Sequence, residues 1–268
     1  MRRLLIRPGA IGDVILSLPA LEFLRADYTE VWAPRPVVPL IRFADRVRAI
    51  PDSGLDLLEI PGQAPAALVR ALGDFDEIVS WYGAGRENFA AAAGRLPIRL
   101  LTAVPPPDSR EHAADYFRRQ VGAPPANPRI ECTSDPGGFA VIHPFSGSPA
   151  KNWPLDRYRA LAQTIDARMP LCWSAGPEEI LDAAQRFDDL YALACWLHSA
   201  RFYIGNDSGI THLAAAVGTP TLALFGPTDP AVWAPRGPHV RVLSTCAAGE
   251  PIDLIAVAEV ESALRKLW

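Results

Sequence analysis

The sequence predicts an α/β protein made of two parallel-sheet domains, and three observations carry this prediction. Short apolar runs of strand length alternate with segments of helical periodicity along most of the 268 residues. A stretch rich in proline and glycine, Ala123 to Gly138, interrupts the alternation near the middle of the chain. Apolar residues make up 49% of the chain, enough for a sizeable core. We therefore expect an N-terminal domain over residues 1–122, a linker over 123–138 and a C-terminal domain over 139–268.

The N-terminal half alternates strand and helix patterns in order. Strands are predicted at residues 3–7, 30–33, 77–81 and 98–102. Helices are predicted at residues 14–25, 63–72 and 87–93, with a further helix around 39–43. Such alternation is typical of a parallel sheet that is covered on both faces.

The alternation restarts after the linker. Strands are predicted at residues 139–143, 171–175, 202–205, 219–225 and 240–243. Helices are predicted at residues 155–167, 178–187, 190–199, 209–217 and 255–268. Whether the last helix packs back on the N-terminal domain is left open. Ligands of such sheets bind at the carboxyl ends of the strands, and two such domains facing each other would form a central cleft.

Composition excludes several classes of protein. The net charge of −4 and the 21% of charged residues give no concentrated basic surface, so no nucleic-acid partner is expected. The four cysteines are scattered without metal-ligand spacing, so no metal site is predicted. Arg7 interrupts the first apolar run, which favours a strand over a signal peptide. Because no apolar stretch is long enough to span a bilayer, we expect a cytoplasmic protein with at most peripheral membrane association, at the inner face of the cytoplasmic membrane.

The first candidate functional segment is RPGAIGDVILSLPAL, residues 7–21. A strand ends, Gly9 and Gly12 allow a tight turn, and a helix begins near Asp13. Asp13 has two interpretations: a helix cap that satisfies free amides, or a general base that faces a cleft. The spacing GxxG is not the dinucleotide-binding pattern GxGxxG.

The second segment is VIHPFSGSPAKNWP, residues 141–154. After a strand, Ser146, Gly147 and Ser148 expose hydroxyl groups and backbone amides that suit phosphate oxygens. Lys151 adds a positive charge and is one of only two lysines in a chain rich in arginine. The alternative is an ordinary strand-to-helix loop with a surface lysine. The Walker pattern GxxxxGK[ST] is absent.

The third segment is YIGNDSGITHLAAAVGTPTLALFGPTDP, residues 203–230. Asp207 and Ser208 are good helix caps, and the helix that begins at Gly209 directs free amides and a positive dipole end toward any anion. His212 lies within reach of the same place, although a histidine in an apolar helix also suits a structural role. The loop FGPTDP ends the next strand and is expected to border the same site.

Two pairs of acidic residues lie outside these three segments. Asp74-Phe75-Asp76 spells DxD, but it precedes a strand rather than following one, so we interpret it as a solvated turn. Glu178 and Glu179 begin a predicted helix, where the dipole favours a capping role. One of them would also reach a nucleotide ribose, and Glu178 is our candidate.

In order, the three segments read GDxxxxLPxLxxLR, HPxSGSPxKxWP and GNDSGxxHLAAAxGTPTLxLFGPTDP. This series closely resembles the ADP-heptose:lipopolysaccharide heptosyltransferases, glycosyltransferase family 9. The resemblance covers most of the chain and is thinner between Thr29 and Pro136. It implies a GT-B fold, in which two Rossmann-like domains face a central cleft. It also implies an inverting enzyme that needs no metal or other cofactor.

The resemblance assigns roles position by position. Asp13 corresponds to the proposed catalytic base, and Lys151 to the lysine that neutralises the donor diphosphate. The remaining donor-side positions are Ser146, Gly147, Ser148, Glu178, Asp207, Ser208, Gly209 and His212. Arg7 and Gly12, which flank the first turn, are assigned to the acceptor. The implied partners are a nucleotide-sugar donor, with ADP-heptose suspected, and a glycolipid or saccharide acceptor.

Two other hypotheses remain open at this point. A nucleotide-sugar-binding protein without transferase activity would use Ser146, Lys151 and Asp207 but would not depend on Asp13. A nucleotide-sugar epimerase or hydrolase would use a similar scaffold and, if a hydrolase, release free sugar without an acceptor.

Overall fold

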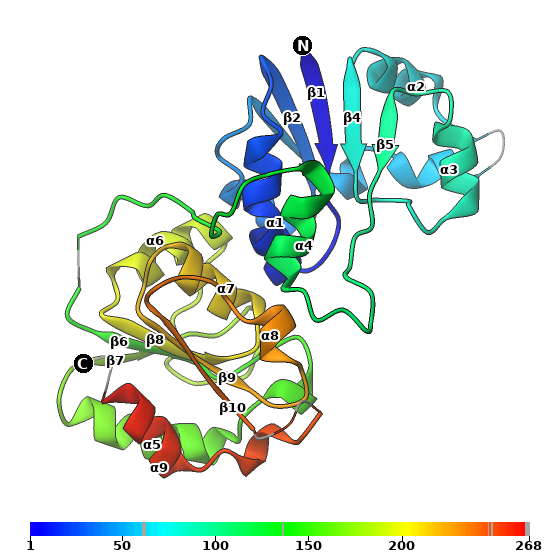
Figure 1. Ribbon diagram of the computed structural model, residues 1–268. Helices are drawn as coiled ribbons and strands as arrows, with labels where there is room; N and C mark the ends of the chain where they lie inside the picture. Colours follow the sequence, from blue (N-terminus) through cyan, green and yellow to red (C-terminus); the bar gives the residue numbers. More distant parts are fainter. Residues whose placement is uncertain (61–62, 136, 246, 248, 266–268) are drawn as a thin grey trace. The chain divides into compact units, whose positions relative to one another are not determined.

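The computed structural model describes residues 1–60, 63–135, 137–245, 247 and 249–265. The chain divides into two compact units, one of Met1–Asp108 with Ala113–Pro125 and one of Ser109–His112 with Ala126–Trp268. Each unit contains its own five-stranded sheet, and every strand pair in both sheets is parallel (Figure 1). The predicted α/β class with two parallel sheets is therefore confirmed.

The first sheet has the order β3-β2-β1-β4-β5. Its strands are β1 (Arg2–Ile6), β2 (Tyr28–Ala33), β3 (Arg46–Ala49), β4 (Glu77–Ser80) and β5 (Ile98–Leu100). The central strand β1 contains the fully buried run from Leu4 to Ile6, because helices cover both faces of the sheet. The edge strand β3, RVRA, was not predicted, since its alternating arginines are polar and its length is short.

Helices lie on both faces of this sheet. They are α1 (Ile11–Phe23), α2 (Ala66–Gly73), α3 (Glu87–Ala93) and α4 (Ala113–Val121), with 3-10 helices at Arg35–Leu40, Ile50–Asp52 and Leu55–Glu59. The helix predicted around residues 39–43 is only partly confirmed, because the structure has a 3-10 helix that begins at Arg35 and ends at Leu40. The helix α4, which lies beside α1, was also not predicted (Figure 1). Its buried Phe117 and its charged last turn form an amphipathic pattern too short to stand out in the sequence.

The second sheet has the order β10-β9-β8-β6-β7. Its strands are β6 (Ala140–His143), β7 (Leu171–Trp173), β8 (Phe202–Asn206), β9 (Thr221–Phe225) and β10 (Val240–Ser244). The helices are α5 (Leu155–Asp166), α6 (Leu190–Ser199), α7 (Gly209–Ala216), α8 (Pro230–Trp233) and α9 (Val257–Leu264), with 3-10 helices at Pro149–Lys151 and Ile252–Leu254. All five strands and four of these helices were predicted; the single turn α8 was not.

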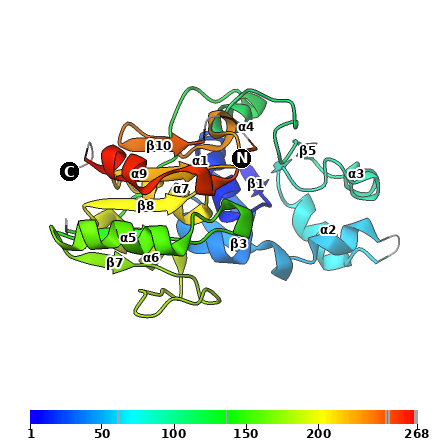
Figure 2. The ribbon, with the colours of Figure 1, turned by 90° about the horizontal axis from the view of Figure 1, so that it is seen from below.

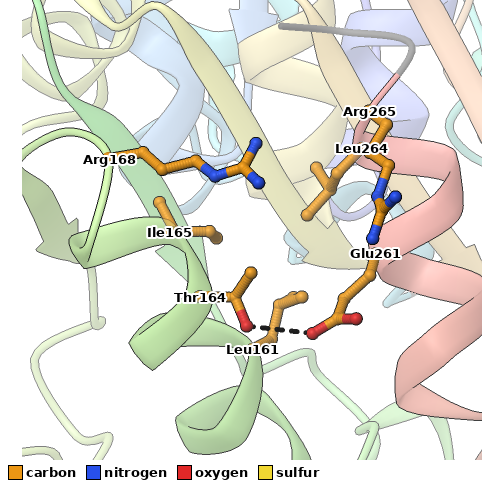
Figure 3. Close-up of a pocket in the computed structure, with 7 residues that line it drawn as sticks. All are labelled: Leu161, Thr164, Ile165, Arg168, Glu261, Leu264 and Arg265. Carbon is orange, nitrogen blue, oxygen red and sulfur yellow. Dashed lines mark hydrogen bonds between the residues drawn. The ribbon is translucent and has the colours of Figure 1, made fainter.

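The helices α5 and α9 pack side by side on one face of the second sheet (Figure 2). Val260 and Leu264 of α9 are buried in the same core as Leu161 and Ile165 of α5. A small groove between the two helices is bridged by the Thr164 hydroxyl, which donates to Glu261 Oε1 at 2.9 Å (Figure 3). The apolar side of α9, whose packing the sequence left open, therefore lies against its own unit; residues 266–268 are outside the described part.

The predicted helix over residues 178–187 is wrong. The segment is a loop in which the Arg186 guanidinium donates to the carbonyl oxygens of Gly176, Glu179 and Leu181. Ala183 has a φ of +57°, which a helix does not accept. Ser174 and Gln185 form an isolated parallel bridge beyond β7. Tertiary hydrogen bonds thus override a helical pattern that the residues alone favour.

Part of the expected linker is attached to the second unit. The Ile130 N–H donates to Ala216 O at 2.9 Å, and the Ser134 hydroxyl donates to Cys195 O at 2.8 Å. These bonds explain why the boundary between the units falls at Pro125, early in the expected linker, of which Pro136 is not described. Among the residues that the structure describes, no helix is both long and apolar enough to cross a bilayer.

Candidate functional site

In each sheet, two neighbouring strands are followed by connections that run toward opposite edges of the sheet. In the second sheet, β6 and β8 are neighbours, but β6 leads outward to β7 while β8 leads to β9 on the other side. In the first sheet, β1 and β4 have the same relation. Loops that leave such neighbouring strands separate and leave a crevice at the carboxyl edge, where α/β sheets bind ligands. All three sequence segments emerge from these strands or from β9 beside them.

The loop after β6 and the loop after β8 meet through an ion pair. Lys151 Nζ donates to Asp207 Oδ2 at 2.7 Å, although the two residues are 56 positions apart. The carboxylate is 8% exposed and the lysine side chain 30% exposed. The Thr228 hydroxyl, from the loop after β9, donates to the same Oδ2 at 2.6 Å. A partly open cation is therefore held by a buried carboxylate at the crevice.

The helix α7 begins directly beside this pair. Ser208 is its N-cap, and the Ser208 hydroxyl oxygen accepts a hydrogen bond from the Thr211 N–H at 3.3 Å. Gly209 and Ile210 contribute the first amides, which have no partner within a helix. His212 lies in the first turn and is 5% exposed. The predicted capping role of Ser208 is thus observed, and the helix start places positive potential next to Lys151.

The serine loop after β6 is ordered by its own hydroxyl groups. Ser146 Oγ lies 2.8 Å from both Ser148 O and Asn152 Oδ1, so it orders the turn that leads into Lys151. Ser148 precedes the 3-10 helix that carries Lys151, and its backbone oxygen accepts the Lys151 N–H at 3.0 Å. Gly147 is exposed at the tip, with open space where a side chain would begin.

Asn206 connects this loop to β8, a role that the sequence did not reveal. Its amide is fully buried, donates to Pro144 O at 2.8 Å, and accepts from the Trp153 N–H and the Tyr158 hydroxyl. By its sequence alone, an asparagine at the end of a strand and just before a helix suits a capping role. Its actual partners lie about fifty to sixty positions earlier. Thr228 belongs to the loop FGPTDP, which was expected to border this site and does so through its bond to Asp207, but the sequence did not single out Thr228 itself.

A histidine and a glutamate lie beyond the same edge of the sheet. His143 ends β6 and is 3% exposed; its Nδ1 lies 3.1 Å from Ser174 O, so this nitrogen carries the hydrogen. Burial lowers the pKa of His143 to about 4. Its Nε2 lies 3.8 Å from Glu179 Oε2, and burial raises the pKa of Glu179. Glu178, the candidate for the ribose, is exposed on the loop that follows β7.

In the first unit, Asp13 occupies the third position of α1. Its Oδ2 accepts a hydrogen bond from the Ala10 N–H at 2.8 Å, while Ala10, the N-cap residue, has no side-chain acceptor of its own. Gly9 has a φ of +121°, and a side chain there would begin 2.9 Å from Asp13 Oδ2. The Asp13 carboxylate thus satisfies a free backbone amide at the start of α1, although the N-cap position belongs to Ala10, and the Asp13 side chain is half-exposed. Gly12 lies beside it in the first helical turn.

Arg7, expected from the sequence to contact the acceptor, has its charge enclosed by the protein. It is fully buried, and its guanidinium donates to Ser17 Oγ, Pro8 O, Ala103 O and Asp13 O at 2.9 to 3.2 Å. The same group stacks on the Phe117 ring at 4.4 Å. Burial lowers the pKa of Arg7 to about 10, which leaves it charged at neutral pH. Four hydrogen bonds thus connect the guanidinium to protein groups, and Arg7 supports the loop that carries Asp13.

The DxD sequence has a structural explanation. Asp76 Oδ2 accepts the Arg2 N–H at 2.6 Å, and Asp74 caps the C-terminal end of α2. Across the described ranges, no three His, Cys, Asp or Glu side chains gather as a metal-binding group. Cys132, Cys172 and Cys195 are half-buried, and Cys246 lies outside the described residues.

Comparison with known proteins connects these features to a family. A family model described as glycosyltransferase family 9 (heptosyltransferase) matches residues 107–254, more than half of the chain. Lipopolysaccharide heptosyltransferase 1 of Escherichia coli strain K12 is 30% identical over 124 residues, which make up 41% of this chain and 38% of that protein. The matched part of the chain thus spans little more than a third of that relative's length.

Two further similarities extend over nearly the whole chain. Lipooligosaccharide heptosyltransferase 2 of Haemophilus ducreyi is 27% identical over 315 aligned positions, covering 93% of this chain and 90% of that protein. A solved structure of an E. coli heptosyltransferase with ADP superposes with a TM-score of 0.73 at 19% identity, covering 100% of both chains. That likeness concerns the fold, and with the two parallel sheets it confirms the GT-B class. The chain therefore belongs to glycosyltransferase family 9, the heptosyltransferase family.

Proposed function

We propose that this protein is an inverting glycosyltransferase that moves a heptose from ADP-heptose to a lipopolysaccharide-core or related saccharide acceptor. The observation that carries this proposal is the Lys151–Asp207 pair beside the start of α7 at the β6–β8 crevice. Family membership supports the reaction class. The structural neighbour solved with ADP supports a nucleoside diphosphate as the leaving group.

The second unit would bind the donor. Breaking the bond between sugar and phosphate develops negative charge on the departing diphosphate, so groups that are already positioned for that charge lower the barrier. Lys151 supplies a cation, Gly209 begins the amides of α7, and the loop of Ser146 to Ser148 supplies hydroxyl and amide donors. Asp207 and His212 would face the donor sugar, and Glu178 the ribose.

The first unit would supply the base. Asp13 would meet the acceptor hydroxyl in the same reaction in which Lys151 holds the diphosphate. Asp13 Oδ2 accepts the Ala10 N–H, so the carboxylate is held in one orientation and can take a proton from the hydroxyl. Direct attack on the anomeric carbon then inverts its configuration. No metal is needed for this sequence of steps.

A glycolipid acceptor would place the protein at a membrane surface. We propose a cytoplasmic enzyme that associates peripherally with the inner face of the cytoplasmic membrane, where nucleotide sugar and lipid-linked acceptor are both accessible. The net charge of −4 gives no general attraction to an anionic surface, so the acceptor itself would provide the contact.

The test is a transfer assay with a donor panel. The purified protein is first heated with ADP-, UDP- and GDP-sugars, and a ligand that binds the folded state raises the melting temperature. We expect ADP-sugars to do so and the others to have little effect. The protein is then given ADP-heptose and a heptose-free lipopolysaccharide core, and mass spectrometry should show one added heptose. Binding without transfer to any acceptor would contradict the proposal and favour a binding protein; release of free heptose without an acceptor would favour a hydrolase.

A further inference from the structure

The loop after β9 is built to hold Thr228 in one place. Gly226 follows β9, and a side chain on it would begin 2.6 Å from the backbone of Ile252, so the loop passes close against the 3-10 helix Ile252–Leu254. Asp229 caps α8 by accepting the Ala231 N–H at 2.9 Å, with Pro230 in the first turn. Thr228 therefore lies between a closely packed glycine and a capped helix, and its backbone has little freedom.

The Thr228 side chain points to the ion pair. Its hydroxyl donates to Asp207 Oδ2 at 2.6 Å, and Lys151 Nζ donates to the same oxygen at 2.7 Å. Three loops, after β6, β8 and β9, thus meet at one carboxylate oxygen. Because the Asp207 side chain is 8% exposed, protein groups rather than water must satisfy most of its charge.

We propose that Thr228 is a positioning residue, which sets the location of the Lys151 ammonium group through Asp207. This inference rests on the proposed function, in which Lys151 binds the donor diphosphate. The hydroxyl satisfies part of the Asp207 charge and fixes the carboxylate, so Lys151 keeps two N–H groups available to phosphate. Without the Thr228 hydroxyl, Lys151 is the side chain that must satisfy Asp207 Oδ2. The Lys151–Asp207 ion pair then becomes tighter, and the ammonium group is less available to the diphosphate.

The test is a double-mutant cycle on ADP binding, measured by calorimetry with the full-length protein. Thr228→Val removes the hydroxyl at equal size, and we expect ADP affinity to fall about three- to tenfold. Thr228→Ser retains the hydroxyl and should bind within about twofold of the wild type. In a Lys151→Met background, the Thr228→Val change should have no further effect, because the threonine acts through the lysine.

A matched control exists in the same unit. Thr164 also donates its hydroxyl to a carboxylate, that of Glu261, on the outer surface of α5 and α9 (Figure 3). Thr164→Val should leave ADP affinity unchanged. If Thr228→Val has a lowered melting temperature, Thr228→Ala repeats the test in a second variant.

The outcomes distinguish failure of the positioning role of Thr228 from failure of the proposed function. If the wild type binds ADP and Thr228→Val binds it equally well, the positioning role is wrong while the proposed function stands. The same conclusion follows if Thr228→Val weakens binding as much in the Lys151→Met background as in the wild type. If the wild type itself has no measurable affinity for ADP, the proposed function fails, and the role of Thr228 fails with it.

Discussion

At the scale of single residues, Arg7 is the buried charge on which the Asp13 loop depends. Its guanidinium satisfies three backbone carbonyl oxygens and stacks on Phe117. Arg7→Met leaves these acceptors without a donor, so the free energy of unfolding in urea should fall by about 3 kcal/mol. Arg25→Met, at an exposed position just after α1, is the control and should change it by less than about 0.5 kcal/mol. Equal stability of the two variants would contradict the supporting role of Arg7.

His143 predicts a specific pH dependence of stability. Burial lowers its pKa from 6.5 to about 4, so between these values the unfolded chain binds a proton that the folded chain excludes. Stability is therefore lost as the pH falls from 6.5 toward 4, by up to about 3 kcal/mol at the lower limit. Above pH 6.5 this residue contributes no pH dependence.

The matched variant is His143→Asn, whose amide can still donate to Ser174 O but does not titrate. Urea unfolding at pH 7 and pH 4 should show a larger loss for the wild type than for the variant. Glu179, which faces the ring at 3.8 Å, titrates in both proteins, so its contribution largely cancels in the comparison. Parallel losses in the two proteins would mean that the ring is charged in the folded state.

At the scale of elements, the loop after β9 depends on a close backbone approach. A methyl group on Gly226 would lie 2.6 Å from the backbone of Ile252, where no side-chain rotation relieves the contact. Gly226→Ala should therefore lower the free energy of unfolding by about 2–3 kcal/mol. Gly147→Ala is the control, since a methyl group there meets open space and should be tolerated. Chemical denaturation of the two variants tests this, and a neutral Gly226→Ala would show that the loop can move away.

The same scale shows what a sequence can and cannot predict. All five strands of the second sheet were predictable: β6, β8 and β9 are buried, short apolar runs, and the half-exposed β7 and β10 are still short runs of mainly apolar residues. The edge strand β3 and the helix α4 were not, because both are polar on the side that faces water. The segment 178–187 has helical composition, yet hydrogen bonds from Arg186 hold it as a loop. Local pattern carries no information about such partners.

The residues of the candidate site also include some that the sequence reveals and some that it does not. Asp13, Lys151 and Asp207 were predictable, because each charged group follows a strand at a turn of small residues. Asn206 and Thr228 were not, since their importance comes from partners 21 to 62 positions away. Arg7 was misassigned because the sequence shows its charge but not the backbone carbonyl oxygens that enclose it.

At the scale of the whole molecule, each unit places one charged group at its own crevice: a carboxylate after β1 and a lysine after β6. The proposed reaction needs both, but in different ways. Lys151 serves the donor, so its loss should weaken ADP binding, whereas Asp13 serves the acceptor, so its loss should leave ADP binding unchanged. A binding protein without transferase activity would show no dependence on Asp13 at all.

The most direct measurement is the initial rate of heptose transfer by Asp13→Asn at saturating ADP-heptose. Asparagine can still accept the Ala10 N–H that Asp13 accepts, so the fold of the loop is retained while the base is lost. Asp76→Asn, which alters a carboxylate that also accepts a backbone N–H in the same unit, is the control and should transfer at the wild-type rate. If Asp13 is the base, the rate should fall by at least about a hundredfold for Asp13→Asn while ADP affinity stays unchanged. Transfer by this variant within a few-fold of the wild type would contradict this role.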